Sequence, residues 1–355
     1  MERARHFPAN LLTTATHDHK RGEDTRARLA VLSERAEWFA ERCRQWRALA
    51  APLREELDDG LAPSPGDELM LLQILLACWP LDLQADDAAG LQTLTERLSA
   101  WQEKAVREAK LRSTWSNPNQ GYEEACRNYL QALLGSDQGA ELRTQIRDAA
   151  AEIAPAGALN SLAQSLLRMS VPGVPDLYQG CEFWDFSLVD PDNRRPVDYA
   201  ARRQALADPQ SVAQALEHWH DGRVKQALIA ATLNTRSTHA QLFAQGDYQP
   251  LEVQGEHADR VVAFMRSLGE QHAIVVVPRL SAELLGDSQL PLIAADQWGD
   301  TRIALPAVLA DKALHSAFDC TAPLAHSGHL ALRDVLRETP VNLLIAHSPS
   351  QESQP

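Results

Sequence analysis

The sequence predicts a mixed α/β fold followed by an all-β region, and three observations support this. Residues 9–14 have the composition of a short buried strand that gives way to a polar loop. Between residues 24 and 170, apolar side chains recur at helical spacing. Residues 261–346 contain several short apolar runs separated by polar turns, the pattern of a small antiparallel β-sandwich.

The polar loop at residues 14–24 follows the first strand and contains the pair His17-Asp18. A strand that leads through a loop into a helix is typical of a β/α barrel, whose active sites lie at the carboxyl ends of the strands. The next helix is expected to be capped by Asp24, with Glu23 favoured by the helix dipole. Asp18 lies too far upstream to cap the same helix.

The helical region contains two narrow apolar stripes. The first predicts one long helix and is formed by Leu29, Leu32, Ala36, Phe39, Cys43, Trp46, Ala50, Leu53 and Leu57. Pro52 lacks a backbone donor and should kink or break that helix near its end. The second stripe is formed by Leu91, Leu94, Leu98, Trp101 and Ala105. We expect the first stripe to pack inside one domain rather than in an intermolecular coiled coil.

Residues 171–198 are rich in Pro, Gly, Asp and aromatic residues and lack a helical period, so they predict loops with one short strand. Two helices are expected at about residues 210–218 and 223–232. Residues 261–265 and 273–277 flank Gly269-Glu270 and predict a hairpin. Further strands are expected at residues 301–305, 329–332 and 341–346.

Composition limits the classes of partner. The net charge of −14 over 355 residues disfavours nucleic acid and anionic membrane surfaces. The longest apolar run, residues 69–81, is interrupted by Gln73 and is too short to span a bilayer, and the first residues do not resemble a secretion signal. The five cysteines are scattered without a ligand or disulfide pattern, which favours a reducing cytoplasm.

Two chemical roles fit the residues of this loop. His17 and His19 would share one face of a strand and could ligate zinc, but no third ligand is evident, so no metal is expected. The alternative is that Asp18 is an active-site carboxylate with His17 beside it. Retaining glycoside chemistry needs hydrogen bonds to sugar hydroxyls that strengthen in the transition state, and these two side chains can supply them.

Four segments then suggest a family. Residues 14–34, beginning Thr-Ala-Thr-His-Asp-His-Lys-Arg-Gly-Glu-Asp, look like the segment that maltooligosyl trehalose synthases carry around their His-Asp pair. Residues 172–182 have the Gly-x-Pro…Gly-x-Glu spacing of the α-amylase superfamily (glycoside hydrolase family 13) at its last barrel strand. Residues 183–199 are similar to a stretch characteristic of the synthase. Residues 107–119 resemble the helical insertion of these synthases.

The resemblance implies a fold and a domain order. We expect the carboxyl-terminal part of a TIM (β/α)8 barrel, with its last two strands near residues 11–16 and 173–178, a large helical insertion between them, and a small antiparallel β-sandwich. The expected domains are 1–35 (strand and helix with the His-Asp motif), 36–170 (helical insertion), 171–235 (last barrel strand, active-site loop and helices), 236–347 (β domain) and 348–355 (disordered tail). A full eight-stranded barrel is not expected, because no other βα pairs are visible.

The resemblance also implies an activity. Such enzymes are (1→4)-α-D-glucan 1-α-D-glucosylmutases, isomerases of trehalose biosynthesis. They convert the reducing-end α-1,4 linkage of a maltodextrin to α,α-1,1 with retention and without a cofactor. Asp18 corresponds to the carboxylate that stabilises the transition state, and His17 to its sugar-binding neighbour. The expected substrate-binding residues are Lys20, Arg21, Lys110, Trp115, Tyr178, Glu182, Trp184 and Arg195.

Each of these substrate-binding residues has a structural alternative. Tyr178 and Trp184 either stack on sugar faces or pack beneath a neighbouring domain. Arg195 either binds hydroxyls or belongs to a salt-bridged loop clamp. Lys110 and Trp115 either close over the substrate or form a helix end with a buried tryptophan. Glu182 is also suited to hold the loop of His17 by hydrogen bonds.

The family's nucleophile and acid/base lie upstream of the His-Asp segment and are not assigned in this sequence. We therefore expect the chain to hold the carboxyl-terminal half of the site, to bind a maltooligosaccharide, and to require an amino-terminal half for activity. Two alternatives stay open. One is an α-amylase-type hydrolase, in which water attacks the intermediate, and the other is a non-catalytic maltodextrin-binding remnant.

Overall fold

The structure is a computed structural model that describes residues 2–58, 60–318, 324 and 327–347. The predicted tail at residues 348–355 and Cys320 lie outside the described residues. Chain contacts divide the protein into two compact units. The helical unit consists of His17–Ala154 and Asp185–Pro196, and the mixed unit consists of Met1–Thr16, Pro155–Trp184 and Val197–Pro355. The domain boundaries expected from the sequence stay predictions.

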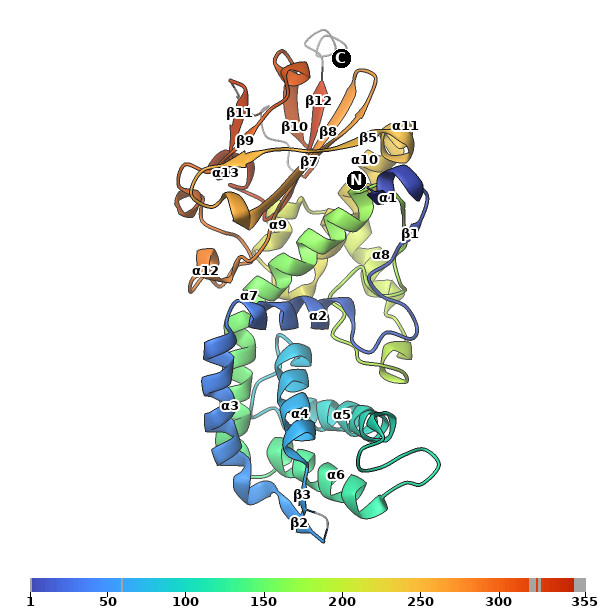
Figure 1. The fold of residues 1–355 in the computed structure, drawn as a ribbon, viewed down its shortest axis with the longest axis vertical. Coiled ribbons are helices and arrows are strands. Elements are labelled where there is room, and N and C mark those ends of the chain that lie inside the picture. Colours follow the sequence, from blue (N-terminus) through green and yellow to red (C-terminus); the bar gives the residue numbers. More distant parts are fainter. Residues whose placement is uncertain (1, 59, 319–323, 325–326, 348–355) are drawn as a thin grey trace. The chain divides into compact units, whose positions relative to one another are not determined.

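The helical unit is built from consecutive helices (Figure 1). They are α2 (Glu23–Ala30), α3 (Ala36–Ala50), α4 (Pro65–Cys78), α5 (Ala88–Ala109), α6 (Gln120–Gly135) and the part of α7 (Ala140–Ser170) that precedes Pro155. A short antiparallel hairpin, β2 (Glu55–Leu57) and β3 (Gly60–Ala62), joins α3 to α4. Short 3₁₀ turns lie at Val31–Ser33, Ala51–Leu53 and Asp192–Arg194.

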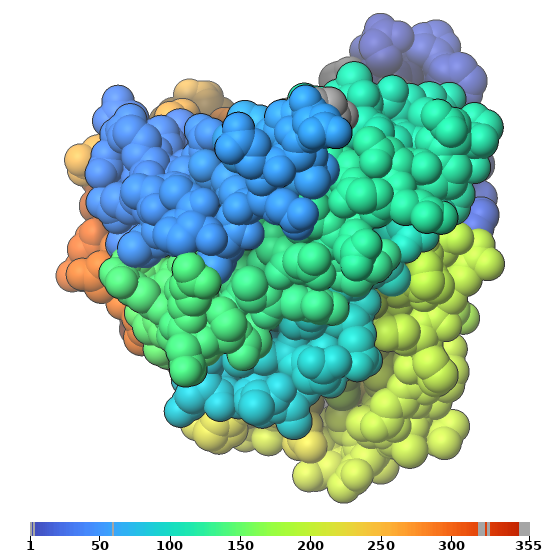
Figure 2. All heavy atoms as spheres, turned by 90° about the horizontal axis from the view of Figure 1, so that it is seen from below, coloured from blue at the N-terminus to red at the C-terminus, as the bar shows by residue number. Residues whose placement is uncertain are grey.

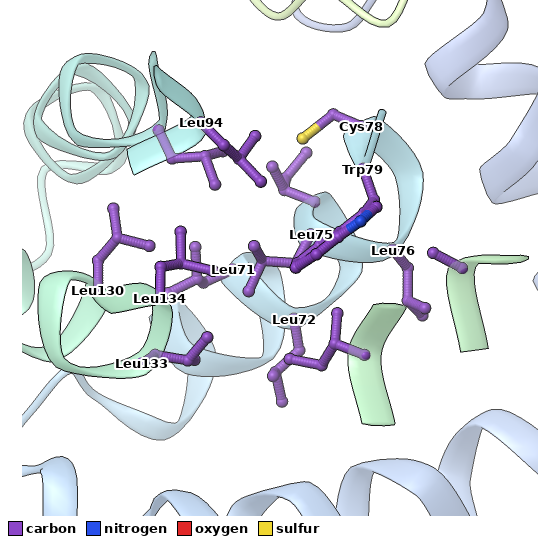
Figure 3. Close-up of a cluster of buried hydrophobic side chains, with 14 of the residues drawn as sticks. Leu71, Leu72, Leu75, Leu76, Cys78, Trp79, Leu94, Leu130, Leu133 and Leu134 are labelled. Carbon is purple, nitrogen blue, oxygen red and sulfur yellow. The ribbon is translucent and has the colours of Figure 1, made fainter. Parts of the chain in front are cut away.

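The core of the helical unit forms around α4, which is apolar almost all round and is therefore expected to be a central helix. Figure 3 shows leucines of α4 facing Leu94 of α5 and Leu130, Leu133 and Leu134 of α6. Trp46 of α3 is fully buried in the same cluster. At the surface, α3 (blue) and the first half of α7 (green) lie side by side (Figure 2), and Arg35 and Arg42 both pair with Glu152 there.

Two local predictions in this unit are wrong. The first apolar stripe does not form one helix, because a 3₁₀ turn at Val31–Ser33 separates α2 from α3. Ser33 donates its hydroxyl to the carbonyl of Ala30, a local bond that competes with regular helix. The predicted cap is also wrong, because α2 begins at Glu23 with Gly22 as its N-cap, and Asp24 lies inside the first turn. Pro52 does follow the end of α3, as expected.

In the mixed unit, two short strands pair in parallel, as the resemblance implies. Leu11 and Leu12 of β1 (Leu11–Leu12) align with Val174 and Pro175 of β4 (Val174–Pro175). Each strand is only two residues long, and the described residues do not close a barrel. Gly173, which has φ +141°, is required beside this pair, because a Cβ there would meet the Leu12 side chain at 2.6 Å.

Arginines hold the chain that leads into β4. Arg236 of α10 (Arg223–Thr238) donates to the carbonyls of Met169, at 2.7 Å, and Gly173, at 3.0 Å. Arg266 is buried and donates to the carbonyl of Ser170 at 2.8 Å. Burial lowers the pKa of the Arg266 guanidinium to about 10, so it stays charged at neutral pH. These bonds satisfy carbonyls at the end of α7, where helices otherwise leave them unpaired.

The remaining helices of the mixed unit are short. They are α1 (Glu2–His6), α8 (Tyr199–Ala207), α9 (Val212–Leu216), α11 (Ala240–Gln245), α12 (Ala282–Leu285) and α13 (Leu332–Val335). Helix α9 and helix α10 correspond to the two helices expected at about residues 210–218 and 223–232.

Two antiparallel sheets follow. One has the strand order β10-β12-β8-β7-β5, and the other has the order β11-β9-β6. The strands are β5 (Asp247–Pro250), β6 (Val253–Gln254), β7 (Val261–Leu268), β8 (Gln271–Pro278), β9 (Arg302–Ala304), β10 (Ala313–Ser316), β11 (His329–Ala331) and β12 (Asn342–His347). The hairpin β7–β8 around Gly269-Glu270 is confirmed, as are β9, β11 and β12. The sequence patterns missed β5, β6 and β10.

Candidate functional site

His17 and Asp18 form an exposed turn between β1 and α2 in the chain. We call these two residues the His-Asp turn. They belong to the helical unit, in which the segment Asp185–Pro196 also lies. The loop that carries the turn and this segment are 160–180 positions apart in the sequence, yet several hydrogen bonds connect them.

The segment Asp185–Pro196 holds both ends of the loop that carries the turn. Before Asp18, the side-chain nitrogen of Asn193 donates to the His17 carbonyl at 2.7 Å. After Asp18, the Gly22 amide donates to the Ser187 carbonyl at 2.7 Å. A Cβ at Gly22 would meet the Asp185 carbonyl oxygen at 2.6 Å, so the close approach requires glycine. The loop around Asp18 is thus fixed at two points.

Side chains of the loop and of α2 add further bonds to the segment. His19 is buried, and its Nε2 lies 3.2 Å from the Ser187 hydroxyl. The hydroxyl of Thr25 donates to the Ser187 carbonyl at 3.2 Å. The carboxylate of Asp24 accepts a hydrogen bond from the Asp185 amide. Asp24 therefore holds the segment instead of capping its own helix.

Lys20 and Arg21 follow the turn and differ in their surroundings. The ammonium group of Lys20 pairs with Glu108 of α5 at 3.2 Å, and both side chains are solvent-accessible. Arg21 forms a backbone bridge with Leu188. Its Nε is buried and has no hydrogen-bond partner among the described residues. Burial lowers the pKa of the Arg21 guanidinium. Because Nε is buried, a ligand hydroxyl would have to bind the other nitrogens of the Arg21 guanidinium.

An ionic clamp, formed by Arg97, Asp192 and Arg195, fixes the segment to α5. Arg97 donates through Nε and Nη2 to the two carboxylate oxygens of Asp192, at 2.9 and 3.0 Å. The Leu188 amide donates to the same carboxylate at 2.8 Å, and Arg195 lies 3.0 Å from it. Burial raises the pKa of the Asp192 carboxyl, but Arg97, Arg195 and the Leu188 amide together outweigh burial and hold that pKa below its usual range.

A second ion pair supports the clamp. Lys104 of α5 pairs with Asp190 at 2.5 Å and lies 3.9 Å from Glu108, the partner of Lys20. The hydrogen bond from Lys104 lowers the pKa of the Asp190 carboxyl. Charges of alternating sign therefore run from the loop of Asp18 through α5 to the segment Asp185–Pro196.

Lys110 and Trp115 lie at and after the carboxyl end of α5. Lys110 is exposed and adopts the left-handed conformation with φ 57°. Trp115 is 57% exposed, which differs from the buried tryptophan of the structural alternative. The guanidinium of Arg107 lies 4.9 Å from the centre of its ring, and Arg107 is itself held by Glu123 at 2.7 Å. The Trp115 ring is thus packed against Arg107 and still has solvent-accessible surface.

Tyr178, Glu182 and Trp184 belong to the mixed unit. Tyr178 is partly buried. Glu182 accepts a hydrogen bond from Arg202 of α8 at 3.0 Å. The indole of Trp184 donates to the Trp219 carbonyl at 2.6 Å and meets the Trp219 ring edge-on. Within this unit, therefore, Glu182 contacts α8 and Trp184 packs against a second tryptophan.

Sequence reasoning missed several residues that hold or border the turn. Asn193, Ser187 and Arg97 act through partners that are 85 or more positions away, so no local spacing predicts their contacts. In the mixed unit, Asp176 follows β4, and its carboxylate lies 3.4 Å from the hydroxyl of Thr13, which follows β1. Polar residues at the ends of two parallel strands were a usable signal, because functional residues gather there.

A large hollow lies elsewhere on the helical unit. It has a volume of about 1050 Å³, lies between α5 and α6, and is lined by Gln92, Glu96, Arg127, Gln131 and Arg143 among others. None of the predicted site residues lines it. Within the described ranges, no group of three or more His, Cys, Asp or Glu side chains is placed to hold a metal ion. No helix in the described part of the chain is both long and apolar enough to cross a bilayer.

Comparison with known proteins defines the class. No family model matches the sequence. The chain is 35% identical over 343 residues to a Mycobacterium tuberculosis protein (strain CDC 1551 / Oshkosh) described as "Putative maltooligosyl trehalose synthase". The match covers 97% of this chain and 38% of that protein. The chain therefore spans about two fifths of the length of the curated relatives it matches.

Solved structures agree with this class. The maltooligosyltrehalose synthase of Arthrobacter ramosus superimposes with a TM-score of 0.72 at 30% identity, covering 98% of this chain and 40% of that one. A glycosyltrehalose synthase of DSM5389 gives a TM-score of 0.68 at 26% identity, covering 95% and 37%. The chain is thus homologous, over nearly its whole length, to a portion of maltooligosyl trehalose synthase.

Proposed function

We propose that this chain supplies part of the site of an enzyme that converts the reducing-end α-1,4 linkage of a maltodextrin to an α,α-1,1 linkage. The observation that supports this most is the 35% identity over 97% of the chain to a protein described as such a synthase. The His-Asp turn supports the proposal further, because it is held by Asn193 and leaves a carboxylate and an imidazole exposed.

In the proposed mechanism, the glycosidic bond is cleaved with retention through a covalent glycosyl-enzyme intermediate. Such chemistry needs a nucleophilic carboxylate and a general acid about 5 Å apart. Asp18 has neither role. It accepts hydrogen bonds from ring hydroxyls that strengthen as charge develops on the sugar, and His17 binds beside it. The released glucose turns and attacks the intermediate through its anomeric hydroxyl.

The nucleophile and the general acid come, in this proposal, from a polypeptide segment equivalent to the part of the synthases that this chain does not span. The parallel pair β1–β4 supports such a partner. Leu11 and Val174 face each other in this pair and are 74% and 47% exposed. Parallel sheets are normally buried on both faces, and an unpaired edge invites a further strand. We infer that β1 and β4 belong to a barrel completed by that segment.

The remaining predicted residues would bind the maltooligosaccharide. Trp115 offers a supported aromatic face, and Arg21 offers a half-buried guanidinium group. Lys20, Lys110 and Arg195 would contribute charged groups, and sugar binding by Tyr178, Glu182 and Trp184 stays a prediction of the resemblance. The cytoplasm stays the expected compartment, and the described cysteines Cys43, Cys78, Cys126 and Cys181 are free thiols.

Incubation with maltopentaose tests the activity. The chain alone is expected to leave the reducing ends intact, because the proposal places the nucleophile on another segment. Mixed with the complementary portion of the M. tuberculosis protein, it is expected to remove reducing ends without net release of glucose. A colorimetric reducing-sugar assay and glucose quantification measure both. Release of glucose or maltose would favour the hydrolase, binding without turnover would favour the maltodextrin-binding remnant, and loss of reducing ends with the chain alone would contradict the need for a second half.

Replacement of Trp115 tests its contact with sugar. Trp115→Ala is expected to weaken maltopentaose binding roughly 5- to 10-fold, since aromatic stacking contributes about 1 kcal/mol beyond area burial. Isothermal titration of the mixture measures the affinity. Leu111→Ala is the matched control, because Leu111 lies in the same loop and is 83% exposed. An equal loss of affinity in both variants would argue against a specific contact.

A further inference from the structure

Asn193 is a buried residue whose side chain serves the backbone of the His-Asp turn. It is 8% exposed, and its Nδ2 donates to the His17 carbonyl at 2.7 Å. The carbonyl it binds is part of the peptide group that joins His17 to Asp18. A bond at this atom limits rotation of the backbone that orients the Asp18 carboxylate.

The orientation of the amide is determined by its neighbours. If the amide were flipped, its oxygen would face the His17 carbonyl oxygen, and two acceptors would repel each other. The observed orientation leaves Oδ1 buried without a hydrogen-bond partner among the described residues. An unpaired buried acceptor is unfavourable. The Asn193 amide keeps this orientation although its oxygen is unpaired, which indicates that the hydrogen bond donated by Nδ2 is needed.

Asn193 rests on a rigid base. It lies in the 3₁₀ turn Asp192–Arg194, and its neighbour Asp192 receives two hydrogen bonds from Arg97 and one from the Leu188 amide. On the other side of Asp18, Gly22 is fixed to Ser187. Asp18 is therefore enclosed between two bonds to one immobilised segment, which removes backbone freedom before any ligand binds.

We propose that Asn193 is a positioning residue, which holds the His-Asp turn in the conformation that Asp18 needs to contact a sugar ring. This inference rests on the proposed function for its sugar-binding consequence, and on the hydrogen bond alone for its effect on the turn. Asn193 does not itself contact the substrate, because its free oxygen is buried. Its effect is transmitted through the His17 carbonyl.

Hydrogen exchange in the absence of sugar tests the effect on the turn. Asn193→Ala is expected to speed amide exchange in a peptide covering residues 16–22 by roughly 5- to 10-fold, the loss of one net hydrogen bond. Asn193→Asp is expected to speed it further, because a carboxylate cannot donate and would repel the His17 carbonyl. Arg194→Ala is the matched control, because Arg194 is the next residue in the chain and its exposed side chain lies 3.7 Å from Asp190. Unchanged exchange in the Asn193 variants would overturn the inference.

A double-mutant cycle distinguishes positioning from a general structural role. The single-turnover rate with maltopentaose is measured for the mixture containing wild-type chain, Asn193→Ala, Asp18→Ala or both substitutions. If Asn193 acts through Asp18, the double variant reacts no more slowly than Asp18→Ala alone. Additive losses would mean that Asn193 acts elsewhere and would overturn the positioning role. If the wild-type mixture binds no sugar, the proposed function fails and the sugar-binding consequence with it. Faster exchange in Asn193→Ala would then still establish that Asn193 fixes the turn.

Discussion

Replacing Arg97 by methionine is expected to lower the free energy of unfolding of the helical unit by about 3 kcal/mol. The Asp192 side chain is 5% exposed, so the substitution leaves a buried carboxylate without its bidentate partner. Removing one member of a buried ion pair costs about 3–5 kcal/mol, and the lower value applies because Arg195 and the Leu188 amide remain. Urea unfolding followed by tryptophan fluorescence measures the change.

Two control variants make this result specific. Arg195→Met removes the other cation of the clamp, whose side chain is 52% exposed, and is expected to cost no more than about 1 kcal/mol. Arg97→Met combined with Asp192→Asn removes the buried charge as well, so it should recover part of the loss. A single Arg97→Met variant as stable as the wild type would show that the clamp contributes little.

The clamp also predicts a pH dependence. The pKa of Asp192 in the folded protein is lower than its ordinary value. Its stabilising contribution is therefore fully present above the unfolded-state pKa of about 3.9, and it is lost as the pH falls through the folded-state pKa. Arg97→Met should remove the part of the acid sensitivity that arises from Asp192, so the two proteins differ in stability most at neutral pH and least in acid.

Helical periodicity and strand patterns predicted the elements that bury one regular face. The stripe from Leu91 to Ala105 lies on α5, and the hairpin β7–β8 follows from two apolar runs around Gly269. The hairpin β2–β3 escaped prediction because Glu55 and Glu56 leave no apolar alternation. Strand β5 was not predicted because it is a polar edge strand that ends in Pro250. Proline within a sheet is found mainly on edge strands, and it argues against a strand when the sequence is interpreted alone.

The candidate site also contains residues that the sequence predicted and residues that it did not. His17 and Asp18 were predicted as site residues because the motif is contiguous and resembles a known segment. The groups that fix them were not, because Asn193 reaches His17 across 176 positions and Arg97 reaches Asp192 across 95. Asp24 was misassigned as a cap for the same reason, since its carboxylate bonds to Asp185 in a distant segment. Local sequence predicts which residues would carry the chemistry, and the fold shows which residues hold them.

Asp18→Asn is expected to lower the rate of glucosyl transfer in the complemented mixture by roughly 10²–10³-fold, the usual cost of removing one group that stabilises transition-state charge. Asn keeps the shape of the side chain and loses only its charge, and Asp18 is exposed, so the fold should be unaffected. Asp86→Asn, an exposed carboxylate in the loop before α5, is the matched control.

Single-turnover rates and maltopentaose affinity together decide the role of Asp18. If Asp18 acts mainly in the transition state, the rate falls far more than the affinity, because hydrogen bonds to ring hydroxyls strengthen as the oxocarbenium ion forms. A parallel loss of rate and affinity would make Asp18 a simple sugar-binding residue. An unchanged rate would exclude it from the site, and the fixed turn would then need another purpose.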